Sequence, residues 1–465
     1  MKAVKGKYYF GGVHPRGMKY LSKDAPIEVM PAPETIAVSL SQSLGKPAKP
    51  VVETGQEVAE GEIIARADGI ISSDVFSSIC GTVTDIKDVK GACGTDEKFI
   101  FIKANGKDDK FSFPPLSDPS PEEIKDRIKQ AGIVGLGGAG FPSAVKVCPH
   151  SRVDTLIVNG AECEPYLTCD HRLMIERTDE IAEGARYIAK ALNVADIKIG
   201  IEANKPDCIK AFEKYSDIQP VILRKKYPTG GEKQLIYIVT GRKVGVGRLP
   251  ADVGVAVFNV ATCFAVYEAV KFGKPLYERT LTVSGKAVKQ QKNLLVKVGT
   301  SVKDIVDYCG GENSAPKKVI QGGPMTGVAL ADYAIYTHKT TSGILLMTDT
   351  EASADEPTPC LNCGKCADVC PMHLMPMNTA FYSSAGDMES AVKYGKTASC
   401  IECGACEYIC PAKRPLIQAI RKTKAYLINK ITPQAESLRT PDQKGRSAPA
   451  VPPSVKNGNK EENNG

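Results

Sequence analysis

Two copies of one cysteine spacing constrain this chain more than any other feature of its sequence. Each copy reads C-x2-C-x2-C-x3-C-P, first from Cys360 to Pro371 and again from Cys400 to Pro411. Runs with this spacing hold [4Fe-4S] clusters, because three thiolates bind one cluster and the fourth cysteine binds its neighbour. The segment therefore predicts a small helical domain with two clusters.

The same rule predicts a crossed set of ligands for the two clusters. The first cluster is expected on Cys360, Cys363, Cys366 and Cys410, and the second on Cys370, Cys400, Cys403 and Cys406. Two zinc sites are the alternative, since zinc modules also use C-x2-C pairs, but a proline after each fourth cysteine fits iron–sulfur loops better. Disulfides are not expected, because the first residues lack the apolar core of an export signal.

The composition indicates a globular chain of several domains. The 465 residues suggest about three domains, and 42% apolar residues suffice to build their cores. No window is long and apolar enough to predict a membrane helix. The net charge of +7 is too small and diffuse to indicate nucleic-acid binding. Residues 412–430, however, hold six basic residues and no acid, which predicts either a solvated helix face or a docking surface for an acidic partner or anionic lipid.

Residues 1–112 predict a compact β domain with an N-terminal extension. From Glu53 to Ile86, short β-branched runs alternate with turn glycines. The pattern resembles the barrel-sandwich hybrid fold of biotinyl and lipoyl domains, which carry a working lysine on an exposed hairpin. No lysine lies between Arg66 and Lys87, so we expect a structural or docking role instead.

Residues 113–275 predict an α/β domain around a mainly parallel sheet. A helix opens this domain, with Ser120 as its cap and Glu123 placed for a capping box. Strand-like and helical runs then alternate. Residues 276–350 are β-rich and fit a small β-grasp module. The cysteine segment spans residues 356–430, and the polar, proline-rich residues 431–465 are expected to form a disordered tail.

A glycine-rich loop, GLGGAGFP, follows the helix that Ser120 caps. It satisfies G-x-G-x-x-G formally, but a Rossmann fingerprint needs a strand before the loop, and here a helix precedes it. Glycine amides still allow a phosphate or a flat ring to approach closely. A tight packing turn is the alternative. The candidate binding residues of this loop and the helix after it are Gly135, Gly137, Gly138, Gly140, Phe141 and Lys146.

Three further pieces carry polar groups where an α/β domain binds ligands. Ligands of such domains lie at the carboxyl ends of the strands, and polar residues here follow apolar strand-like runs. Two carboxylates two residues apart suit ribose hydroxyls or a flavin edge better than a phosphate. The candidate residues are Asn159, Glu162 and Glu164 after one strand, Tyr227, Gly230, Gly231 and Glu232 in a second loop, and Asn259 within an apolar run.

These four pieces, in this order, resemble the flavin- and NADH-binding subunits of respiratory complex I and related NADH-oxidising subunits. With two ferredoxin runs at its end, the chain from Tyr9 to Lys430 resembles the C subunits of Rnf ion-translocating electron-transport complexes. The resemblance implies a Rossmann-like FMN/NADH domain, an SLBB-type β-grasp module and two [4Fe-4S] clusters. The chain departs from the complex I pattern at three positions, where complex I has Arg, Asp and Glu in place of Leu136, Ala161 and Gly231.

The resemblance also implies roles for the candidate residues. The glycine loop and Lys146 would hold non-covalent FMN and the phosphates of NADH, and Phe141 would contact the dinucleotide. Asn159 would line the flavin and nicotinamide site together with Glu162 and Glu164, the two acids implied to be catalytic. The other residues implied to lie along the cofactor are Tyr227, Gly230, Gly231 and Glu232, with Asn259 on the side of the FMN phosphate.

The function that the resemblance implies is that of a peripheral subunit on the cytoplasmic face of the bacterial inner membrane. Its complex would couple ferredoxin and NAD chemistry to ion transport. The subunit would exchange hydride with NAD(H) at FMN and exchange single electrons with partner subunits, including a ferredoxin-like iron–sulfur subunit. Two alternatives stay open: the diaphorase subunit of a soluble hydrogenase or dehydrogenase complex, and a non-catalytic electron-transfer module.

Overall fold

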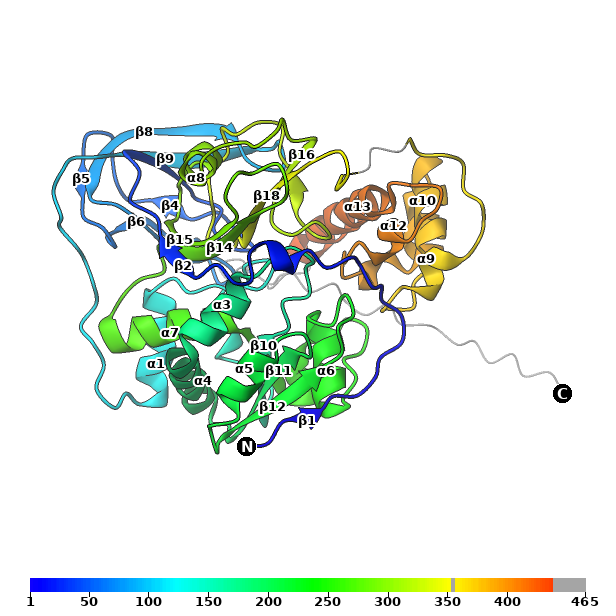
Figure 1. Cartoon of the computed structure of the whole chain (residues 1–465), viewed down its shortest axis with the longest axis horizontal. Helices are drawn as coiled ribbons and strands as arrows, with labels where there is room; N and C mark the ends of the chain where they lie inside the picture. The colour runs from blue at the N-terminus through cyan, green and yellow to red at the C-terminus, as the bar shows by residue number, and fades with distance from the viewer. Residues whose placement is uncertain (353–355, 438–465) are drawn as a thin grey trace.

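The computed structural model describes residues 1–352 and 356–437, except for the side chains of residues 431–437. Within this part of the chain there are two β domains, one α/β domain and one helical domain (Figure 1). The two β domains lie together on one side of the α/β domain, and the helical domain lies at one end of the molecule (Figure 1). This is the predicted multidomain architecture.

The α/β domain contains one parallel sheet with the strand order β1-β12-β11-β10-β13. Its central strands are apolar along most of their length because helices cover both faces of such a sheet. The strands are β1 (Val4–Lys5), β10 (Thr155–Gly160), β11 (Asp196–Glu202), β12 (Ile218–Leu223) and β13 (Val255–Asn259). The helices are α1 (Pro121–Gln130), α2 (Ser143–Lys146), α3 (Cys169–Glu176), α4 (Thr178–Leu192), α5 (Pro206–Phe212), α6 (Glu232–Thr240) and α7 (Val260–Phe272), and a 3-10 turn, η2, spans Pro250–Val253.

The predicted start of α1 is confirmed. The hydroxyl of Ser120 accepts a hydrogen bond from the backbone N–H of Glu123 at 3.3 Å, and the Glu123 carboxylate accepts one from the Ser120 N–H at 2.8 Å. This capping box satisfies two N–H groups that a helix start otherwise leaves without partners. The helix ends at Gln130, a few residues before the glycine loop begins at Gly135.

The first β domain consists of two small antiparallel sheets that enclose one apolar core, which includes Ile36, Ile64 and Ile100. One sheet contains β3 (Thr35–Ser39), β9 (Asp96–Ala104), β8 (Gly81–Lys90) and β5 (Glu57–Val58). The other contains β4 (Lys49–Pro50), β6 (Ile63–Arg66) and β7 (Val75–Phe76).

The second β domain is a mixed sheet that is covered by one short helix, α8 (Val302–Tyr308). The strand order is β17-β16-β18-β14-β15-β2. The strands are β2 (Ile27–Val29), β14 (Glu278–Ser284), β15 (Lys292–Lys297), β16 (Lys318–Gln321), β17 (Val328–Ala329) and β18 (Gly343–Met347).

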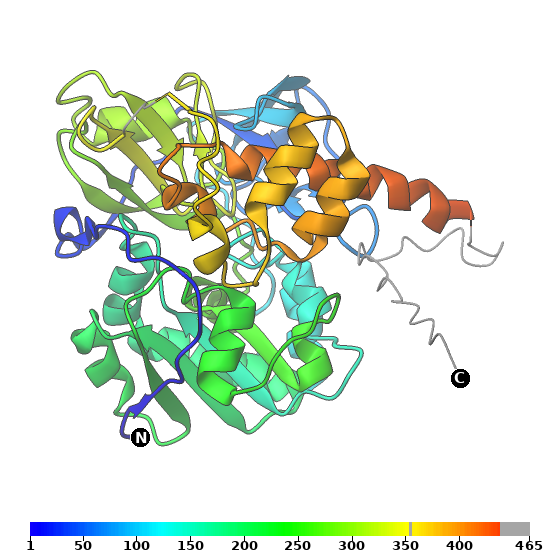
Figure 2. The same ribbon diagram turned by 90° about the vertical axis from the view of Figure 1, so that its right-hand side faces the viewer.

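The N-terminal extension predicted for the first β domain pairs with the other domains. β1 joins β12 at the edge of the parallel sheet, and β2 joins β15 in the second β domain. Between them, residues 6–22, which we call the strap, cross the face of the molecule that is turned to the viewer in Figure 2 and include the turn η1 (Lys19–Leu21). The N–H of Gly12 donates to the carbonyl of Val369 at 2.7 Å, so the strap also touches the helical domain.

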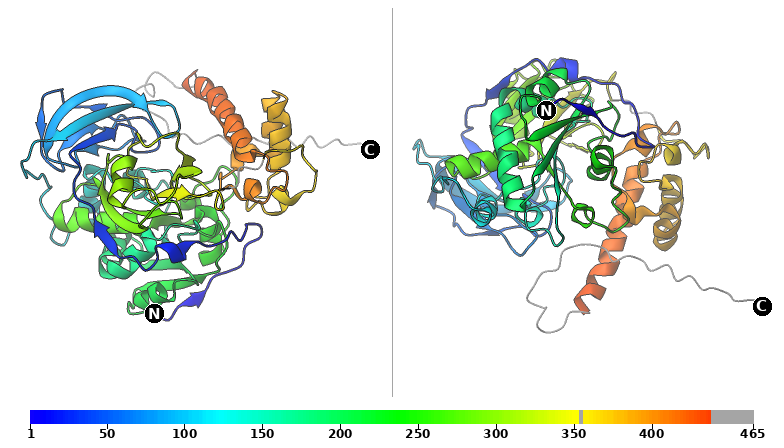
Figure 3. Two further views of the ribbon diagram at one scale, coloured as in Figure 1. Left: turned by 45° about the horizontal axis from the view of Figure 1, so that its top comes forward. Right: turned by 90° about the horizontal axis from the view of Figure 1, so that it is seen from below.

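The helical domain contains two short helices, one within each cysteine run, and three longer ones. They are α9 (Lys365–Asp368), α10 (Pro376–Ser384), α11 (Met388–Gly395), α12 (Ala405–Tyr408) and α13 (Leu416–Ser437), with a 3-10 turn, η3 (Thr397–Ser399). α13 continues seven residues past the predicted domain end at 430 and projects beyond the other domains (Figure 3). The tail predicted beyond it, residues 438–465, lies outside the described residues. Across the described residues, none of the helices has both the length and the apolar character that a bilayer crossing requires.

Candidate functional site

The glycine loop forms an open turn between α1 and α2. Its ends are joined by a hydrogen bond of 2.9 Å from the N–H of Gly135 to the carbonyl of Phe141. Gly137 and Gly138 are exposed, and a side-chain carbon placed on Gly138 would meet no atom within 4 Å. Gly138 therefore faces open space, as a loop that binds a phosphate or a flat ring requires.

Contacts on both sides of Leu136 hold the glycine loop in place. The N–H of Leu136 donates to the hydroxyl of Thr262 at 2.9 Å, and its carbonyl accepts a hydrogen bond from the Arg279 guanidinium at 2.9 Å. Thr262 belongs to α7 and Arg279 to β14, so two domains fix one residue of the loop. Arg279 is only 2% exposed, and no motif in the sequence pointed to it.

The polar residue predicted within an apolar run, Asn259, lies beneath the glycine loop at the end of β13. Its side-chain oxygen caps α7 by accepting from the N–H of Ala261 at 2.8 Å, and its amide donates to the carboxylate of Asp170 at 2.7 Å. A side-chain carbon on Gly137 would lie 2.9 Å from the Asn259 Cβ. Glycine at position 137 therefore lets the loop lie close to the start of α7.

Asn159 and Asn259 are register partners at the carboxyl ends of the neighbouring strands β10 and β13. The Asn159 side chain donates to the carbonyl of Gly230 at 2.9 Å, and so ties the end of β10 to the loop before α6. The structure thus brings together residues from all four predicted pieces. This position, the carboxyl edge of a parallel sheet, is where α/β domains bind their ligands.

Lys146 and Glu232 form an ion pair of 2.7 Å beside this edge. The Lys146 ammonium also donates to the carbonyl of Val257 at 3.0 Å. Both side chains are partly exposed, at 27% and 39%, so the pair can be reached from solvent. A cation that shares an exposed site with one carboxylate can exchange it for the phosphate of a ligand.

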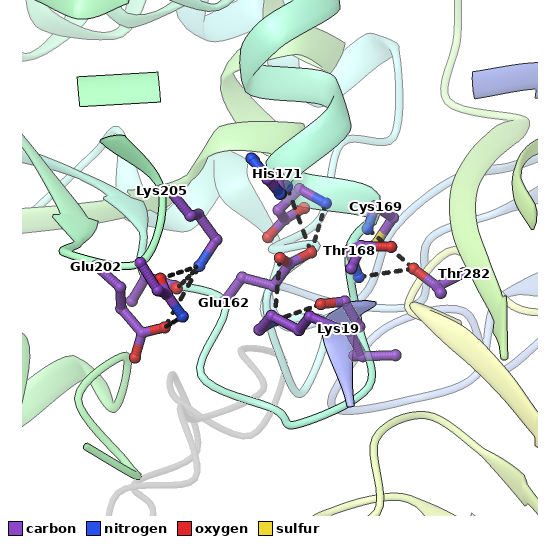
Figure 4. A network of polar contacts seen from close by, with 12 residues as sticks. Lys19, Glu162, Thr168, Cys169, His171, Glu202, Lys205 and Thr282 are labelled. Carbon is purple, nitrogen blue, oxygen red and sulfur yellow. Dashed lines mark hydrogen bonds and ion pairs between the residues drawn. The ribbon is translucent and has the colours of Figure 1, made fainter. Parts of the chain in front are cut away.

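The side chain of Glu162, in the loop after β10, is held by the strap and by the start of α3. Its backbone is left-handed, with φ of 47°, and its side chain is 3% exposed. One carboxylate oxygen pairs with Lys19 of the strap at 3.2 Å, and the other accepts from the N–H of Asp170 at 2.7 Å, at the start of α3 (Figure 4). Glu162 therefore joins the strap to α3, a partnership that the sequence alone did not indicate.

Glu164 is held in a similar way by the second β domain. Its carboxylate accepts from the N–H of Met325 at 3.0 Å and from the hydroxyl of Thr326 at 2.6 Å. Burial raises the pKa of this carboxyl above its ordinary value, although the two hydrogen bonds oppose the shift. The predicted catalytic roles of Glu162 and Glu164 stay predictions, and the structure gives each acid a structural role as well.

The two cysteine runs adopt matching backbone conformations. Gly364 and Gly404 have φ of 76° and 75°, Asn362 and Glu402 have φ of 52° and 54°, and His373 and Lys413 have φ of 54° and 50°. The duplicated spacing in the sequence is thus also a duplication in structure.

Four cysteines line one small cavity inside the helical domain, together with apolar side chains such as Ile417 and Ile420. These four are Cys370, Cys400, Cys403 and Cys406, the set predicted for the second cluster. An enclosed apolar cavity with four thiols suits a [4Fe-4S] cluster, whose thiolate ligands it would shield from water. The ligands expected for the first cluster lie nearer to solvent, since Cys360 and Cys363 are exposed and Cys366 and Cys410 are half-buried.

The cavity for the second cluster adjoins the loop before α6. Tyr227 packs in one apolar cluster with Ala405, and Cys163 and Cys403 lie against it. At the start of α6, the Gln234 amide donates to the carbonyl of Pro371 at 3.3 Å. The loop that carries the third predicted motif therefore touches both the end of β10 and the helical domain.

Comparisons with known protein families match four consecutive parts of the chain. The RnfC barrel sandwich hybrid domain matches residues 7–107, and the Nuo51 FMN-binding domain matches residues 128–268. The SLBB domain matches residues 280–329, and the 4Fe-4S dicluster domain matches residues 359–414. The chain therefore contains an FMN-binding domain and a domain for two [4Fe-4S] clusters.

Curated relatives match almost the whole chain. The C subunit of the proton-translocating ferredoxin:NAD(+) oxidoreductase complex of Clostridium ljungdahlii is 43% identical, over 90% of this chain and 94% of that protein. The chain belongs to the RnfC family. The C subunit of the Na(+)-translocating ferredoxin:NAD(+) oxidoreductase complex of Acetobacterium woodii is 40% identical, over 91% of this chain and 98% of that protein. Among solved structures, an NAD+-reducing [NiFe]-hydrogenase in the H2-reduced state aligns with a TM-score of 0.44 and 18% identity, over 72% of this chain and 69% of that chain.

Local packing accounts for two of the three departures of this RnfC family member from the complex I pattern. Leu136 is 3% exposed and packs into the apolar core of the α/β domain, where an arginine would be buried. A side-chain carbon on Gly231 would lie 2.7 Å from the Gln234 side chain and 3.6 Å from Ile401 of the helical domain. A glutamate there would have to displace the contact with the helical domain.

Proposed function

We propose that this chain is the NAD(H)-reacting subunit of an ion-translocating ferredoxin:NAD oxidoreductase complex. It exchanges hydride with NAD(H) at non-covalent FMN and exchanges single electrons with partner subunits through two [4Fe-4S] clusters. The names of its relatives support this proposal, because both are C subunits of ferredoxin:NAD(+) oxidoreductase complexes. One relative is named for protons and the other for sodium ions, so the proposal does not specify the ion.

The residues around the glycine loop fit FMN. The exposed backbone of Gly137 and Gly138 and the start of α7 offer N–H groups to a phosphate, and Lys146 offers a cation. The side chains of Asn159 and Asn259 fix the strand ends under the loop through the hydrogen bonds described above. FMN, when bound, supplies the link between two-electron exchange with NAD(H) and one-electron exchange with iron–sulfur clusters.

The chain's own residues have positioning and electrostatic tasks in this proposal. Lys146 would turn from Glu232 to a ligand phosphate, and the released carboxylate could accept hydrogen bonds from ribose hydroxyls. Glu162 and Glu164 keep the loop after β10 fixed against the strap and the second β domain. Phe141 is half-buried beside the loop and is the residue proposed to contact the dinucleotide.

One observation carries the electron-transfer part of the proposal. Tyr227 and Cys163 of the α/β domain pack directly against Cys403 and Ala405 of the helical domain. A ligand of the proposed second cluster therefore contacts the loop that also holds Asn159 of the flavin site. This contact favours an enzyme that passes electrons from the flavin to the clusters over a non-catalytic electron-transfer module.

The decisive experiment uses the full chain, purified anaerobically and reconstituted with FMN. We expect about one FMN per chain, iron and acid-labile sulfide for two clusters, and NADH-dependent reduction of an artificial dye. Glu164→Ala should abolish dye reduction, whereas Thr326→Val, which removes a partner of Glu164 but keeps the acid, should retain most of it. Flavin-free and inactive protein after reconstitution would instead favour the non-catalytic electron-transfer module.

The proposed place of the subunit is peripheral, on the cytoplasmic face of the cell membrane, in contact with an iron–sulfur partner. The basic stretch, residues 412–430, offers fewer free cations to an acidic partner or anionic lipid than its sequence suggests. Arg421 and Lys424 both pair with Glu402, and Lys430 pairs with Glu389. Release of the protein from membranes by salt, together with co-purification of other subunits in mild detergent, would support a peripheral place. A fully soluble complex with a hydrogenase or dehydrogenase would favour the diaphorase alternative.

A further inference from the structure

A second cavity adjoins Cys163, in the loop after β10. It has a volume of about 300 Å³ and is formed by four segments: the strap, the loop after β10, the end of β11 and the residues after β12. Cys163 lines this cavity, and its sulfur would lie 3.4 Å from a side-chain carbon on Gly230, the partner of Asn159. The cavity is thus a neighbour of the flavin site, but the residues that line it include none from the glycine loop.

The lining of this cavity is strongly cationic. It contains the side chains of Arg16, Lys19, Lys225 and Lys226, and Glu202 is its one acidic residue. Lys19 is paired with Glu162, and the Lys226 ammonium lies over the rings of Tyr8 and Tyr9. The side chains of Arg16 and Lys225 are exposed and form no hydrogen bond or ion pair within the described part of the chain. Two cations without a partner at the rim of a cavity favour the binding of an anion.

The lining also offers hydrogen-bond acceptors. Glu202 is 2% exposed, and both hydrogen bonds made to its carboxylate, from Lys205 and Asn204 at 3.3 Å, end on the same oxygen, Oε2 (Figure 4). The other oxygen, Oε1, is available to a ligand that lies in the cavity. A carboxylate at the end of a strand commonly accepts hydrogen bonds from ribose hydroxyls. Gly17 keeps the rim open, because a side-chain carbon there would lie 2.9 Å from the Lys225 ammonium.

We infer that this cavity is a second ligand site, which takes a nucleoside phosphate. Its phosphate would bind Arg16 and Lys225, and its ribose would bind Glu202 and Asn204. The volume of about 300 Å³ lies at the lower end of the range for small-molecule sites, so it suits one nucleoside phosphate but not a whole dinucleotide. The inference goes beyond the proposed function, because Tyr227 is the one lining residue that is also placed along the FMN, and Arg16, Lys225, Glu202 and Asn204 have no part in the proposed NAD(H) site.

The test measures binding of AMP to the FMN-loaded protein by calorimetry at low salt. The Arg16→Ala/Lys225→Ala double variant should bind AMP at least about tenfold more weakly, because a charge-assisted pair with phosphate is lost at each position. The control, Lys286→Ala/Lys317→Ala, removes two exposed cations from the second β domain and should bind AMP as the wild type does. Asn204→Ala should weaken AMP binding but not the binding of inorganic phosphate.

NADH-dependent dye reduction in the same variants separates this site from the NAD(H) site. The Arg16→Ala/Lys225→Ala variant should keep both kcat and KM for NADH. A tenfold rise in its KM would show that the cavity belongs to the NAD(H) site, and would overturn the inference. So would a lack of AMP binding, AMP binding that the double variant leaves unchanged, or AMP binding no tighter than that of inorganic phosphate. Because calorimetry does not depend on turnover, an inactive protein would count against the proposed function but not against this site.

Discussion

The carboxylate of Glu164 accepts a hydrogen bond of 2.6 Å from the hydroxyl of Thr326, and this contact joins the loop after β10 to the second β domain. The adjacent N–H of Met325 donates to the same carboxylate at 3.0 Å. A side-chain carbon on Gly323 would lie 2.3 Å from the Glu164 carboxyl carbon, so that loop approaches the acid closely. The second β domain is therefore part of the support for the proposed NAD(H) site.

We expect Thr326→Val to destabilise the protein by about 1 kcal/mol, because the half-buried carboxylate of Glu164 loses a hydrogen-bond donor. The measurement is the midpoint of thermal or denaturant unfolding of the FMN-loaded chain. Thr95→Val, at an exposed position in the first β domain, is the matched control and should change the midpoint little. Equal midpoints for the two variants would show that the Thr326 hydroxyl contributes nothing to stability.

Gly12→Ala should weaken electron exchange between the flavin site and the clusters. Gly12 lies in the strap with φ of 80°, and a side-chain carbon there would lie 2.5 Å from the carbonyl of Tyr227. The substitution would push the strap away from Tyr227 and from Val369 of the helical domain. We expect NADH to reduce the flavin at an almost normal rate while the clusters are reduced several-fold more slowly, as followed by stopped-flow absorbance.

Gly106→Ala is the control for the effect of backbone strain alone. Gly106 has a similar φ of 76°, but nothing lies within 4 Å of the side-chain carbon that the substitution adds. Its flavin and cluster reduction should both resemble the wild type. If both variants slowed cluster reduction equally, the contact of the strap with Tyr227 would have no part in electron transfer.

Local sequence signals predicted much of this structure because their physical causes are local. The two cysteine runs, the cap at Ser120 and the polar residues at strand ends each depend on a few neighbouring residues. The N-terminal residues behave differently, because β1 and β2 complete sheets whose other strands lie hundreds of residues away. No periodicity within so short a strand can indicate its partner.

The partners of the site acids could not be read from the sequence for the same reason. Glu162 pairs with Lys19 and Glu164 with Thr326, and each pair joins segments more than 140 residues apart. The basic stretch shows the converse, since its cations looked free in the sequence but Lys424 pairs with Glu402 in the fold. Charge in a sequence indicates how many ionic groups are present, whereas the fold determines which of them remain for a partner.

The crossed ligand sets predict which cysteine substitutions damage the same cluster. Cys370→Ala should remove the same cluster as Cys406→Ala, although Cys370 belongs to the first run, because both line one cavity. Each variant should lose about half of the iron, and the two should share one remaining electron paramagnetic resonance signal. Cys410→Ala and Cys363→Ala should share the other signal. Cys93→Ala, at an exposed cysteine in the first β domain, should keep all of its iron.

A pattern that followed the order of the sequence would contradict the crossed assignment. In that case Cys370→Ala would match Cys363→Ala, and Cys410→Ala would match Cys406→Ala. Retention of two zinc ions per chain, with no acid-labile sulfide, would contradict iron–sulfur clusters altogether.

The buried carboxyl of Asp170 should make stability depend on pH. Burial raises its pKa to about 6, and the nearby Glu162 carboxylate adds to the rise. The folded protein therefore holds this proton at pH values where the unfolded chain has released it, so the free energy of unfolding falls as the pH rises from about 4 to about 6. The loss at neutral pH is at most about 3 kcal/mol. Asp170→Asn can keep the hydrogen bond to Asn259 without the charge, and should unfold at a higher temperature than the wild type at pH 7.5 but not at about pH 3.5, where the carboxyl is protonated in both states. Scanning calorimetry at both pH values checks this, with Asp126→Asn at an exposed position of α1 as the control. A difference between Asp170→Asn and the wild type that is the same at both pH values would mean that Asp170 does not titrate in this range.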